Sequence, residues 1–184
     1  MKKTVLMVLA ALSIAGAAEC TYRVMDFEIG WEAYKTPAKI GVEGTFGNIK
    51  LSAMPDKTVT GLLEGAKVVI DTNSVNSKNS GRDAKLVKFF FNTQGVRTIT
   101  AEIKKVKESS ADVEITMNGV TRTVPMKLEF DGEDVKAEGY VDLADFDMLP
   151  SLKSINKACY DLHKGKTWQD LKIEFEIKTM EKCK

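Results

Sequence analysis

The distribution of apolar residues repeats with a period of two, and this feature limits most strongly how the chain can fold. In residues 171–178, LKIEFEIK, each apolar side chain has a charged neighbour, and residues 112–117, DVEITM, alternate in the same way. Successive side chains of a β-strand point to opposite faces, so this pattern is typical of strands with one face in a core and the other in water. We therefore expect a chain built mainly from antiparallel β-strands.

Short turns connect several of these strands. Asn118-Gly119 and Asp131-Gly132 tolerate the positive φ angles of two-residue hairpins, which predicts three consecutive antiparallel strands around them. The same alternation elsewhere brings the total to eight or nine strands. A sheet of that size can hide its edges by closing on itself, so we predict an all-β fold, an antiparallel barrel of about eight strands.

Two segments break the alternation and predict one or two short helices. The Ser80 hydroxyl stands three residues before the Asp83 carboxylate, a spacing that predicts a capped helix start. After Pro150 apolar residues recur at steps of three and four and give a helix one apolar stripe, formed by Leu152, Ile155, Cys159 and Leu162. We expect both helices to cover or flank the barrel.

The first residues read as a signal peptide. Lys2 and Lys3 precede an apolar run from Val5 to Leu12, and small residues follow it. The run is too short to remain as a membrane anchor. We therefore expect residues 1–18 to be removed and residues 19–184 to form one soluble periplasmic domain without an integral membrane span.

The charge balance disfavours a nucleic-acid partner. The chain has 27 Lys and Arg against 26 Asp and Glu, and two of the lysines belong to the predicted signal peptide. Surfaces that bind nucleic acids typically combine clustered basic residues with aromatic ones, and the sequence has no such cluster.

Three cysteines follow the predicted signal peptide, and export would allow one disulfide among them. If the first and last strands of a closed barrel are antiparallel neighbours, Cys20 lies near Cys183, which favours that pair. Pairing of Cys20 with Cys159 is an alternative. In a third interpretation Cys159 is a buried apolar residue.

The residues give little support to catalysis. His163 is the only histidine, and no cysteine pair has the spacing of zinc ligands. Neither a nucleophile motif such as Gly-x-Ser-x-Gly nor a phosphate-binding glycine loop occurs. We expect no enzyme, no metal and no cofactor.

Four segments stand out as motifs, namely VVIDTNSVNSKNSGRDAKLVKFFF at 68–91, ITMNGVTRTVPMKLEF at 115–130, VDLADFDM at 141–148 and GVEGTFGNIK at 41–50. Together they resemble the YceI-like family. The resemblance covers nearly the whole mature chain in the family's order. It implies an exported, eight-stranded, lipocalin-like antiparallel barrel that holds a polyisoprenoid or similar long-chain lipid, and it makes a homodimer possible.

Apolar side chains are the candidates for a lipid chamber. Large aromatic, Leu and Met residues suit a flexible hydrocarbon chain, and the predicted chamber residues are Trp31, Phe46, Leu86, Phe89, Phe90, Phe91, Met117, Met126, Leu128, Phe146 and Met148. Arg82, Asp83 and Tyr34 are the candidates for contact with a polar head group. For Arg82 and Asp83 the alternative is a structural role, in which the pair caps the short helix and fixes it to the barrel.

These observations predict a periplasmic protein that binds, transports or sequesters a long-chain isoprenoid or similar amphiphilic lipid. Each CH₂ group removed from water contributes about 0.8 kcal/mol, so even partial insertion of such a chain favours binding. The alternative is a structural or stress-related interaction protein with a solid core, in which aromatic side chains fill the barrel. Phe46, Phe130, Phe175 and Trp168 are the residues that could fill it.

Overall fold

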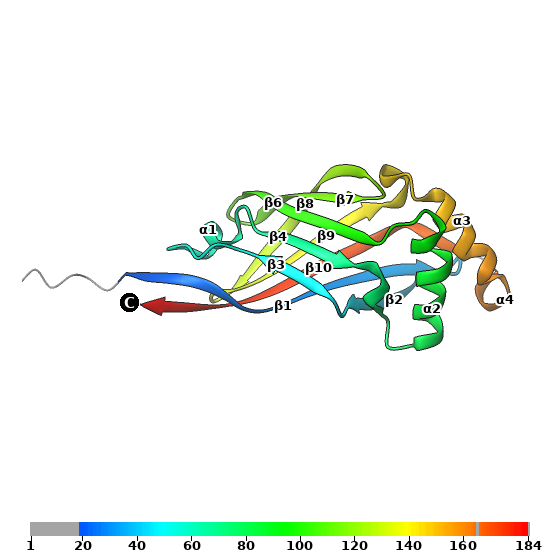
Figure 1. Cartoon of the computed structure of the whole chain (residues 1–184), viewed down its shortest axis with the longest axis horizontal. Helices are drawn as coiled ribbons and strands as arrows, with labels where there is room; N and C mark the ends of the chain where they lie inside the picture. Colours follow the sequence, from blue (N-terminus) through cyan, green and yellow to red (C-terminus); the bar gives the residue numbers. More distant parts are fainter. Residues whose placement is uncertain (1–18, 165, 184) are drawn as a thin grey trace, which may run out of the picture.

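The computed structural model describes residues 19–164 and 166–183, and the predicted signal peptide, residues 1–18, lies outside them. The chain forms one elongated barrel with short helices at its two ends (Figure 1). Its strands are β1 (Cys20–Lys35), β2 (Ile40–Phe46), β3 (Ile49–Ser52), β4 (Lys67–Asp71), β5 (Val75–Asn76), β6 (Thr98–Val106), β7 (Ser110–Met117), β8 (Val120–Asp131), β9 (Asp134–Asp142) and β10 (Thr167–Cys183). The α-helices are α1 (Val59–Leu63), α2 (Ser80–Phe89), α3 (Leu149–Ala158) and α4 (Tyr160–His163). Three 3₁₀ helices, η1 (Thr72–Ser74), η2 (Phe91–Thr93) and η3 (Leu143–Phe146), complete the described secondary structure.

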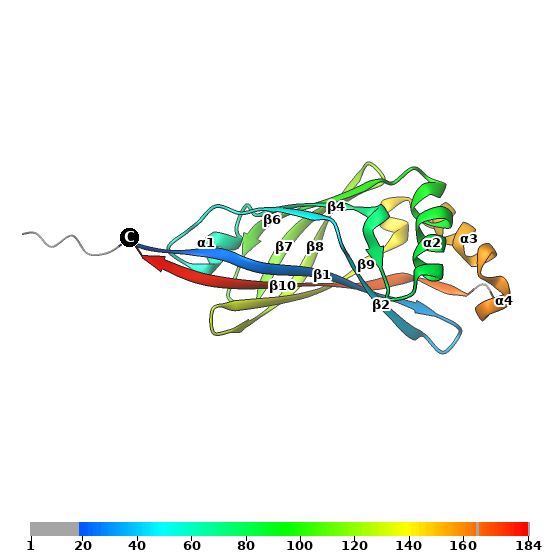
Figure 2. The same cartoon turned by 60° about the horizontal axis from the view of Figure 1, so that its bottom comes forward.

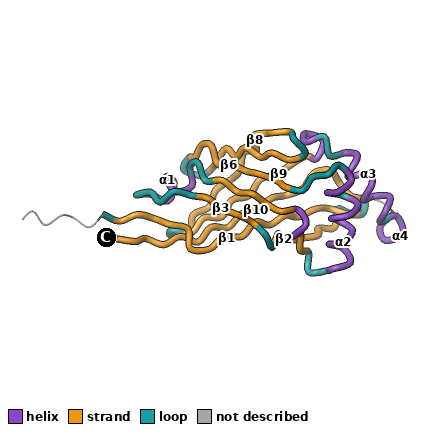
Figure 3. The backbone as a smooth tube through the Cα atoms, in the orientation of Figure 1, coloured by secondary structure: helices purple, strands orange, loops and turns teal. Residues whose placement is uncertain are grey.

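All strand pairs are antiparallel and belong to one ten-stranded sheet, in the order β3-β4-β6-β7-β8-β9-β10-β1-β2-β5. The predicted all-β, lipocalin-like antiparallel barrel is therefore confirmed. The predicted number of eight strands needs correction to ten. The strands wrap around a common axis, as the tube in Figure 3 shows.

The difference in strand number comes from two interruptions that face each other. Gly47-Asn48 separates β2 from β3, and η1 separates β4 from β5. Backbone hydrogen bonds continue across the gap, from Gly47 N to Ser74 O at 2.9 Å and from Asp71 N to Asn48 O at 3.0 Å. Two of the eight expected strands are thus each bent into two pieces, and pairing still runs around the barrel.

The local sequence accounts for the bend at η1. The Asp71 carboxylate accepts a hydrogen bond from Asn73 N at 2.9 Å, which caps the turn. The buried Thr72 hydroxyl donates to the carbonyl oxygen of Val96 at 2.7 Å. Because both side chains satisfy backbone groups that a regular ladder would otherwise pair, the strand ends here without leaving unpaired polar groups.

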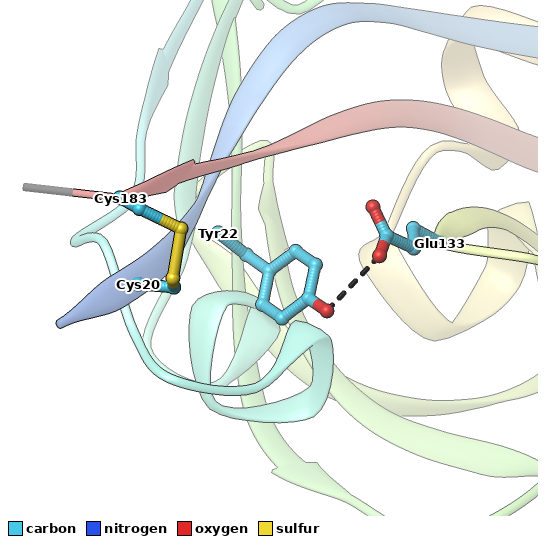
Figure 4. Close-up of a disulfide and its surroundings, with 4 residues drawn as sticks. All are labelled: Cys20, Tyr22, Glu133 and Cys183. Atoms are coloured by element: carbon cyan, nitrogen blue, oxygen red, sulfur yellow. Dashed lines mark hydrogen bonds between the residues drawn. A yellow bond between two sulfur atoms is a disulfide. The ribbon is translucent and has the colours of Figure 1, made fainter. Parts of the chain in front are cut away.

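The longest strands, β1 and β10, pair from end to end and extend beyond the rest of the barrel as a two-stranded ribbon (Figure 1). A register shift between Val24 and Asp26 reverses which face of β1 carries the apolar residues. A disulfide joins Cys20 to Cys183 at the tip of the ribbon, and nearby the Tyr22 hydroxyl donates to Glu133 at 3.0 Å (Figure 4). Cys159 is a free, buried thiol.

Helices α2, α3 and α4 gather at one end of the barrel together with the turn between β1 and β2 (Figure 2). We call this the helical end, and we call the opposite end, with α1 and the Cys20–Cys183 bond, the disulfide end. The predicted start of α2 needs a correction, because Asn79 and not Ser80 caps it, accepting a hydrogen bond from Arg82 N at 2.9 Å. Asp83 instead reaches outside the helix and accepts from Ser77 N at 2.9 Å.

The packed core lies to one side of the barrel. Inward side chains of β7, β8 and β9 are fully buried, as in Val113, Met126 and Val135. Inward side chains of β1, β2 and most of β10 are only half-buried, although they are equally apolar. The interior is therefore not filled on the side of these three strands.

Candidate functional site

The unfilled interior is a cavity of about 850 Å³ that runs from the barrel centre to the helical end. This volume lies within the range of about 300–1,000 Å³ that is usual for sites that bind small molecules. Apart from a few polar residues, its wall consists of aliphatic and aromatic side chains. Such a wall can shelter a hydrocarbon from water and offers few polar partners to a water molecule.

The alternation in β10 and β1 builds one side of this wall. Leu171, Ile173 and Phe175 of β10 all line the cavity, and Ile173 is paired with Trp31 of β1. On its other side Trp31 is paired with Gly44 of β2, where the absence of a side chain leaves room for the indole. The period of two in the sequence is thus the direct cause of a continuous apolar surface.

The cavity opens to solvent at the helical end. Ile40 at the start of β2 and Leu162 of α4 both line it, yet they are 53% and 68% exposed. Polar and basic side chains share this part of the wall, namely Tyr34, Lys35, Thr36, Asn79, Arg82 and Lys85. The site therefore combines an apolar interior with a polar, largely basic mouth.

Contacts between β10 and the turn that joins β1 to β2 hold the shape of the mouth. The Trp168 indole donates a hydrogen bond to the carbonyl oxygen of Thr36 at 2.8 Å. The Lys39 ammonium lies 2.6 Å from the Asp170 carboxylate and 4.6 Å from the centre of the Trp168 ring. The hydrogen bond from Lys39 lowers the pKa of Asp170, so this contact persists at neutral pH.

Burial at the mouth also affects Tyr34. Loss of hydration raises the pKa of its phenol, and the neighbouring Glu32 carboxylate adds to the effect. The phenol therefore stays neutral at physiological pH, and its hydroxyl donates to Glu32 at 3.3 Å. Tyr34 therefore contributes a neutral polar group to the mouth, whose charged residues on the cavity wall are mainly basic.

The structure places most of the predicted chamber residues on the cavity wall. These are Trp31, Phe46, Leu86, Phe90, Phe91, Met117 and Met126. Two of the three predicted head-group residues, Arg82 and Tyr34, also line it, near its mouth. Their contact with a ligand stays a prediction.

Five predicted site residues lie elsewhere, and their positions need correction. Leu128, Phe146 and Met148 are buried in the packed core and do not reach the cavity. Phe89 sits beneath the Lys88 ammonium, 5.1 Å from it, and is also absent from the wall. Asp83 bonds to Ser77, which supports its alternative role as a residue that fixes the helix.

The helices contribute wall residues that were not assigned to the chamber. The cavity is lined by Leu152 and Ile155 of α3, by Cys159 at the C-terminal cap of α3, and by Leu162 of α4. Their spacing at three and four residues predicted one apolar face, but not that this face meets an unfilled barrel. Cys159 agrees with the interpretation of a buried apolar residue.

The described residues contain one group close enough to hold a metal ion, formed by Cys20, Glu181 and Cys183. Both of its sulfur atoms belong to the disulfide, so no thiolate is available there.

Within residues 19–164 and 166–183, no helix is long and apolar enough to cross a bilayer.

Comparison with solved structures identifies the same fold in three bacterial proteins. A polyisoprenoid-binding domain from Saccharophagus degradans, implicated in plant cell wall breakdown, has a TM-score of 0.63 at 11% identity and covers 91% of this chain and 100% of its own. BcnA from Burkholderia cenocepacia has a TM-score of 0.56 at 13% identity, with coverages of 84% and 96%. The YceI protein of Campylobacter jejuni has a TM-score of 0.53 at 17% identity, with coverages of 100% and 99%.

Sequence comparison gives the family. None of the curated proteins shows significant sequence similarity to the chain. The profile of the YceI-like domain matches residues 26–179, a range that reaches into every strand of the barrel. This match extends over far more than half of the sequence, and the chain therefore belongs to the YceI-like domain family.

Proposed function

We propose that this protein binds the hydrocarbon chain of an isoprenoid or similar amphiphilic lipid inside its barrel. The observation that carries the proposal is the apolar cavity of about 850 Å³ with a polar mouth at the helical end. The Saccharophagus degradans domain, which has the same fold, is described as polyisoprenoid-binding. Burial of a chain in this cavity would contribute about 0.8 kcal/mol for each CH₂ group.

The cavity argues against the alternative of a solid-cored structural protein. Phe46, Phe175 and Trp168 line the cavity and leave its centre unfilled. Phe130, the fourth residue that could have filled the barrel, is 39% exposed. A binding role is also favoured over catalysis, since the wall is almost entirely hydrocarbon.

The polar mouth suits the head group of an amphiphile. Arg82 and Lys85 lie one helical turn apart on α2, and both line the cavity. Within residues 19–164 and 166–183, neither has a carboxylate within 4.0 Å. They are free to donate to a polar or anionic head group while the chain extends into the barrel.

We further propose that the protein works in the periplasm, as a carrier or a store for its lipid. The support for this location is the signal-peptide pattern of residues 1–18 and a disulfide, which needs an oxidising compartment. A cavity that opens to solvent allows the lipid to enter and leave.

A pair of adjacent substitutions tests the binding site. Ala101 of β6 lines the cavity, whereas its neighbour Thr100 is exposed on the outside of the same strand. Ala101→Phe should fill part of the cavity and reduce lipid uptake about tenfold or more. If the ring displaces two CH₂ groups of the lipid chain, about 1.6 kcal/mol of binding free energy is lost, which corresponds to at least a tenfold loss of affinity. Thr100→Phe, the control, adds the same ring outside and should leave uptake unchanged.

The two tryptophans provide the measurement, because Trp31 and Trp168 both line the cavity. Energy transfer from them to a dansyl-labelled geranylgeranyl probe reports occupancy without detergent. Mass spectrometry of an organic-solvent extract of the purified protein identifies any lipid it carries. Absence of both energy transfer and extracted long-chain lipid would contradict the proposed function.

A further inference from the structure

The helical end carries an excess of positive charge. The turn at residues 35–39, helix α2, residues 149–164 and residue 166 together hold nine Lys and Arg and two Asp. These segments lie together at one end of the molecule, around the mouth of the cavity (Figures 1 and 2). The exposed Asp145 and Asp147 directly before α3, and Asp170 beside Lys39, reduce this excess but do not cancel it. The chain as a whole is close to neutral, so the charge is concentrated here and does not reflect overall composition.

The basic residues of the helical end are mostly unpaired. Several lysines on the outer face of the sheet, by contrast, have carboxylate partners, as in Lys104 with Glu102 at 3.0 Å and Lys172 with Glu174 at 2.9 Å. Of the nine basic residues at the helical end, Lys39 alone has an ion pair within 4.0 Å in the described part of the chain. The charge at this end is therefore available to an external anion.

Exposed apolar side chains lie among these charges. Ile40, Tyr160 and Leu162 are 53%, 65% and 68% exposed, and the first and last also line the mouth of the cavity. A surface with lysines around exposed apolar and tyrosine side chains is typical of proteins that rest on a membrane interface.

The disulfide end has no comparable combination. Met25 and Met54 are exposed there, but the turns and caps at this end carry acidic residues, including Glu64, Glu108 and Glu133. Anionic lipid head groups would repel that end. The distribution of charge thus distinguishes the two ends where exposed apolar surface alone does not.

We propose that the helical end docks on the surface of an anionic lipid bilayer, with the mouth of the cavity facing the lipids. Unpaired lysines attract anionic head groups, and each lysine near the membrane surface increases the affinity for the membrane about fivefold. Ile40, Tyr160 and Leu162 lie in the head-group region, and the cavity continues from this apolar rim into the barrel. Docking is a property of the outer surface, so it extends the proposed function and can fail independently of it.

Sedimentation with vesicles tests the proposal. The purified protein is mixed with vesicles of phosphatidylcholine alone or of phosphatidylcholine and phosphatidylglycerol in equal amounts, at low and at high salt. We expect binding to the anionic vesicles only, with strong weakening at high salt. Equal binding to both kinds of vesicle, or none to the anionic ones, would overturn the proposal, and the latter result would point to an acidic protein as the partner.

Matched variants locate the docking surface. Lys88→Gln, Lys153→Gln, Lys157→Gln and Lys164→Gln are combined in one variant, which removes four exposed charges from the helical end. The control removes four exposed lysines elsewhere, by Lys107→Gln, Lys127→Gln, Lys136→Gln and Lys178→Gln. The first variant should bind anionic vesicles more than about a hundredfold more weakly, and the control should change binding only severalfold. Equal losses in the two variants would show that net charge alone matters and would overturn the proposal.

Uptake of the dansyl-labelled probe in vesicle-free solution separates this inference from the proposed function. The helical-end variant should still take up the probe, because none of its four substituted residues lines the cavity. Vesicle binding without probe uptake by the unmodified protein would leave docking intact and contradict lipid binding inside the barrel.

Discussion

Gly44 determines where the Trp31 indole lies in the barrel wall. A Cβ atom at this position would overlap Trp31 Cζ2 and would lie 2.9 Å from the backbone oxygen of Asn76. Both approaches are closer than a normal van der Waals contact. Close packing of the two strands and the position of a large cavity-lining ring therefore depend on one missing side chain.

Gly44→Ala should destabilise the protein and move the indole towards the cavity. Overpacking of this kind costs about 1–3 kcal/mol, and the displaced ring should also reduce probe uptake. The measurements are urea unfolding and the wavelength of tryptophan emission. Gly47→Ala is the control, since its Cβ would meet its nearest neighbour at 3.7 Å. Similar stability of the two variants would contradict this account of Gly44.

At the scale of an element, helix α2 depends on its ends more than on its packing. None of its residues is fully buried, although Leu86 faces the cavity. Its N-terminus is fixed by the Asn79 cap and by the bonds that the Asp83 carboxylate accepts from Ser77. Leu86, Val87 and Phe89 pack against the core but are only partly buried, so a helix over an unfilled interior has fewer of the apolar contacts that usually stabilise helices. The polar bonds at its N-terminus therefore carry more of its stability.

Asp83→Ala should loosen α2 without unfolding the barrel. It leaves the backbone N–H of Ser77, a buried residue, without its partner, at a cost of about 1–3 kcal/mol. We expect faster hydrogen exchange of the α2 amides while the amides of β7 stay protected. Asp161→Ala on α4 is the control, because this exposed carboxylate makes no hydrogen bond in the described part of the chain. Unchanged exchange in α2 would contradict the anchoring role of Asp83.

At the scale of the whole molecule, the barrel is closed by pairing between the first and last strands. β1 and β10 pair from Cys20–Cys183 at one end to Lys35–Thr167 at the other. The disulfide at the tip of this ribbon joins residues that are 163 positions apart in the sequence. Almost the whole described chain thus lies within one covalent loop, which limits the unfolded ensemble.

Cys20→Ser combined with Cys183→Ser should lower the free energy of unfolding by about 2–5 kcal/mol, as for other native disulfides. Urea unfolding with and without a reductant measures the effect. The reductant should destabilise the unmodified protein but leave the double variant unchanged, because its remaining cysteine, Cys159, is unpaired. Probe uptake should persist in the double variant, since the bond lies at the end away from the mouth. Equal stability of the oxidised protein and the double variant would contradict this role.

Local sequence was sufficient to predict most of the strands, their inward faces and the hairpin turns, but not the two breaks that raise the number of strands from eight to ten. Asn118 and Gly119 have φ angles of 54° and 75°, as the Asn-Gly pair predicted. Alternation in residues 171–178 predicted which side chains of β10 face inward. These features depend on residues close in sequence, so a pattern in the sequence is enough to predict them.

Only the tertiary structure decided which inward side chains meet each other and which meet empty space. Leu128 and Met126 stand two positions apart on the same face of β8, yet Leu128 is buried in the packed core and Met126 reaches the cavity. Whether an inward residue packs or lines a cavity depends on the width of the barrel and on side chains from distant strands and helices. The sequence by itself thus determined an apolar interior, whereas the closure of the strands and the position of α2 and α3 left part of that interior empty.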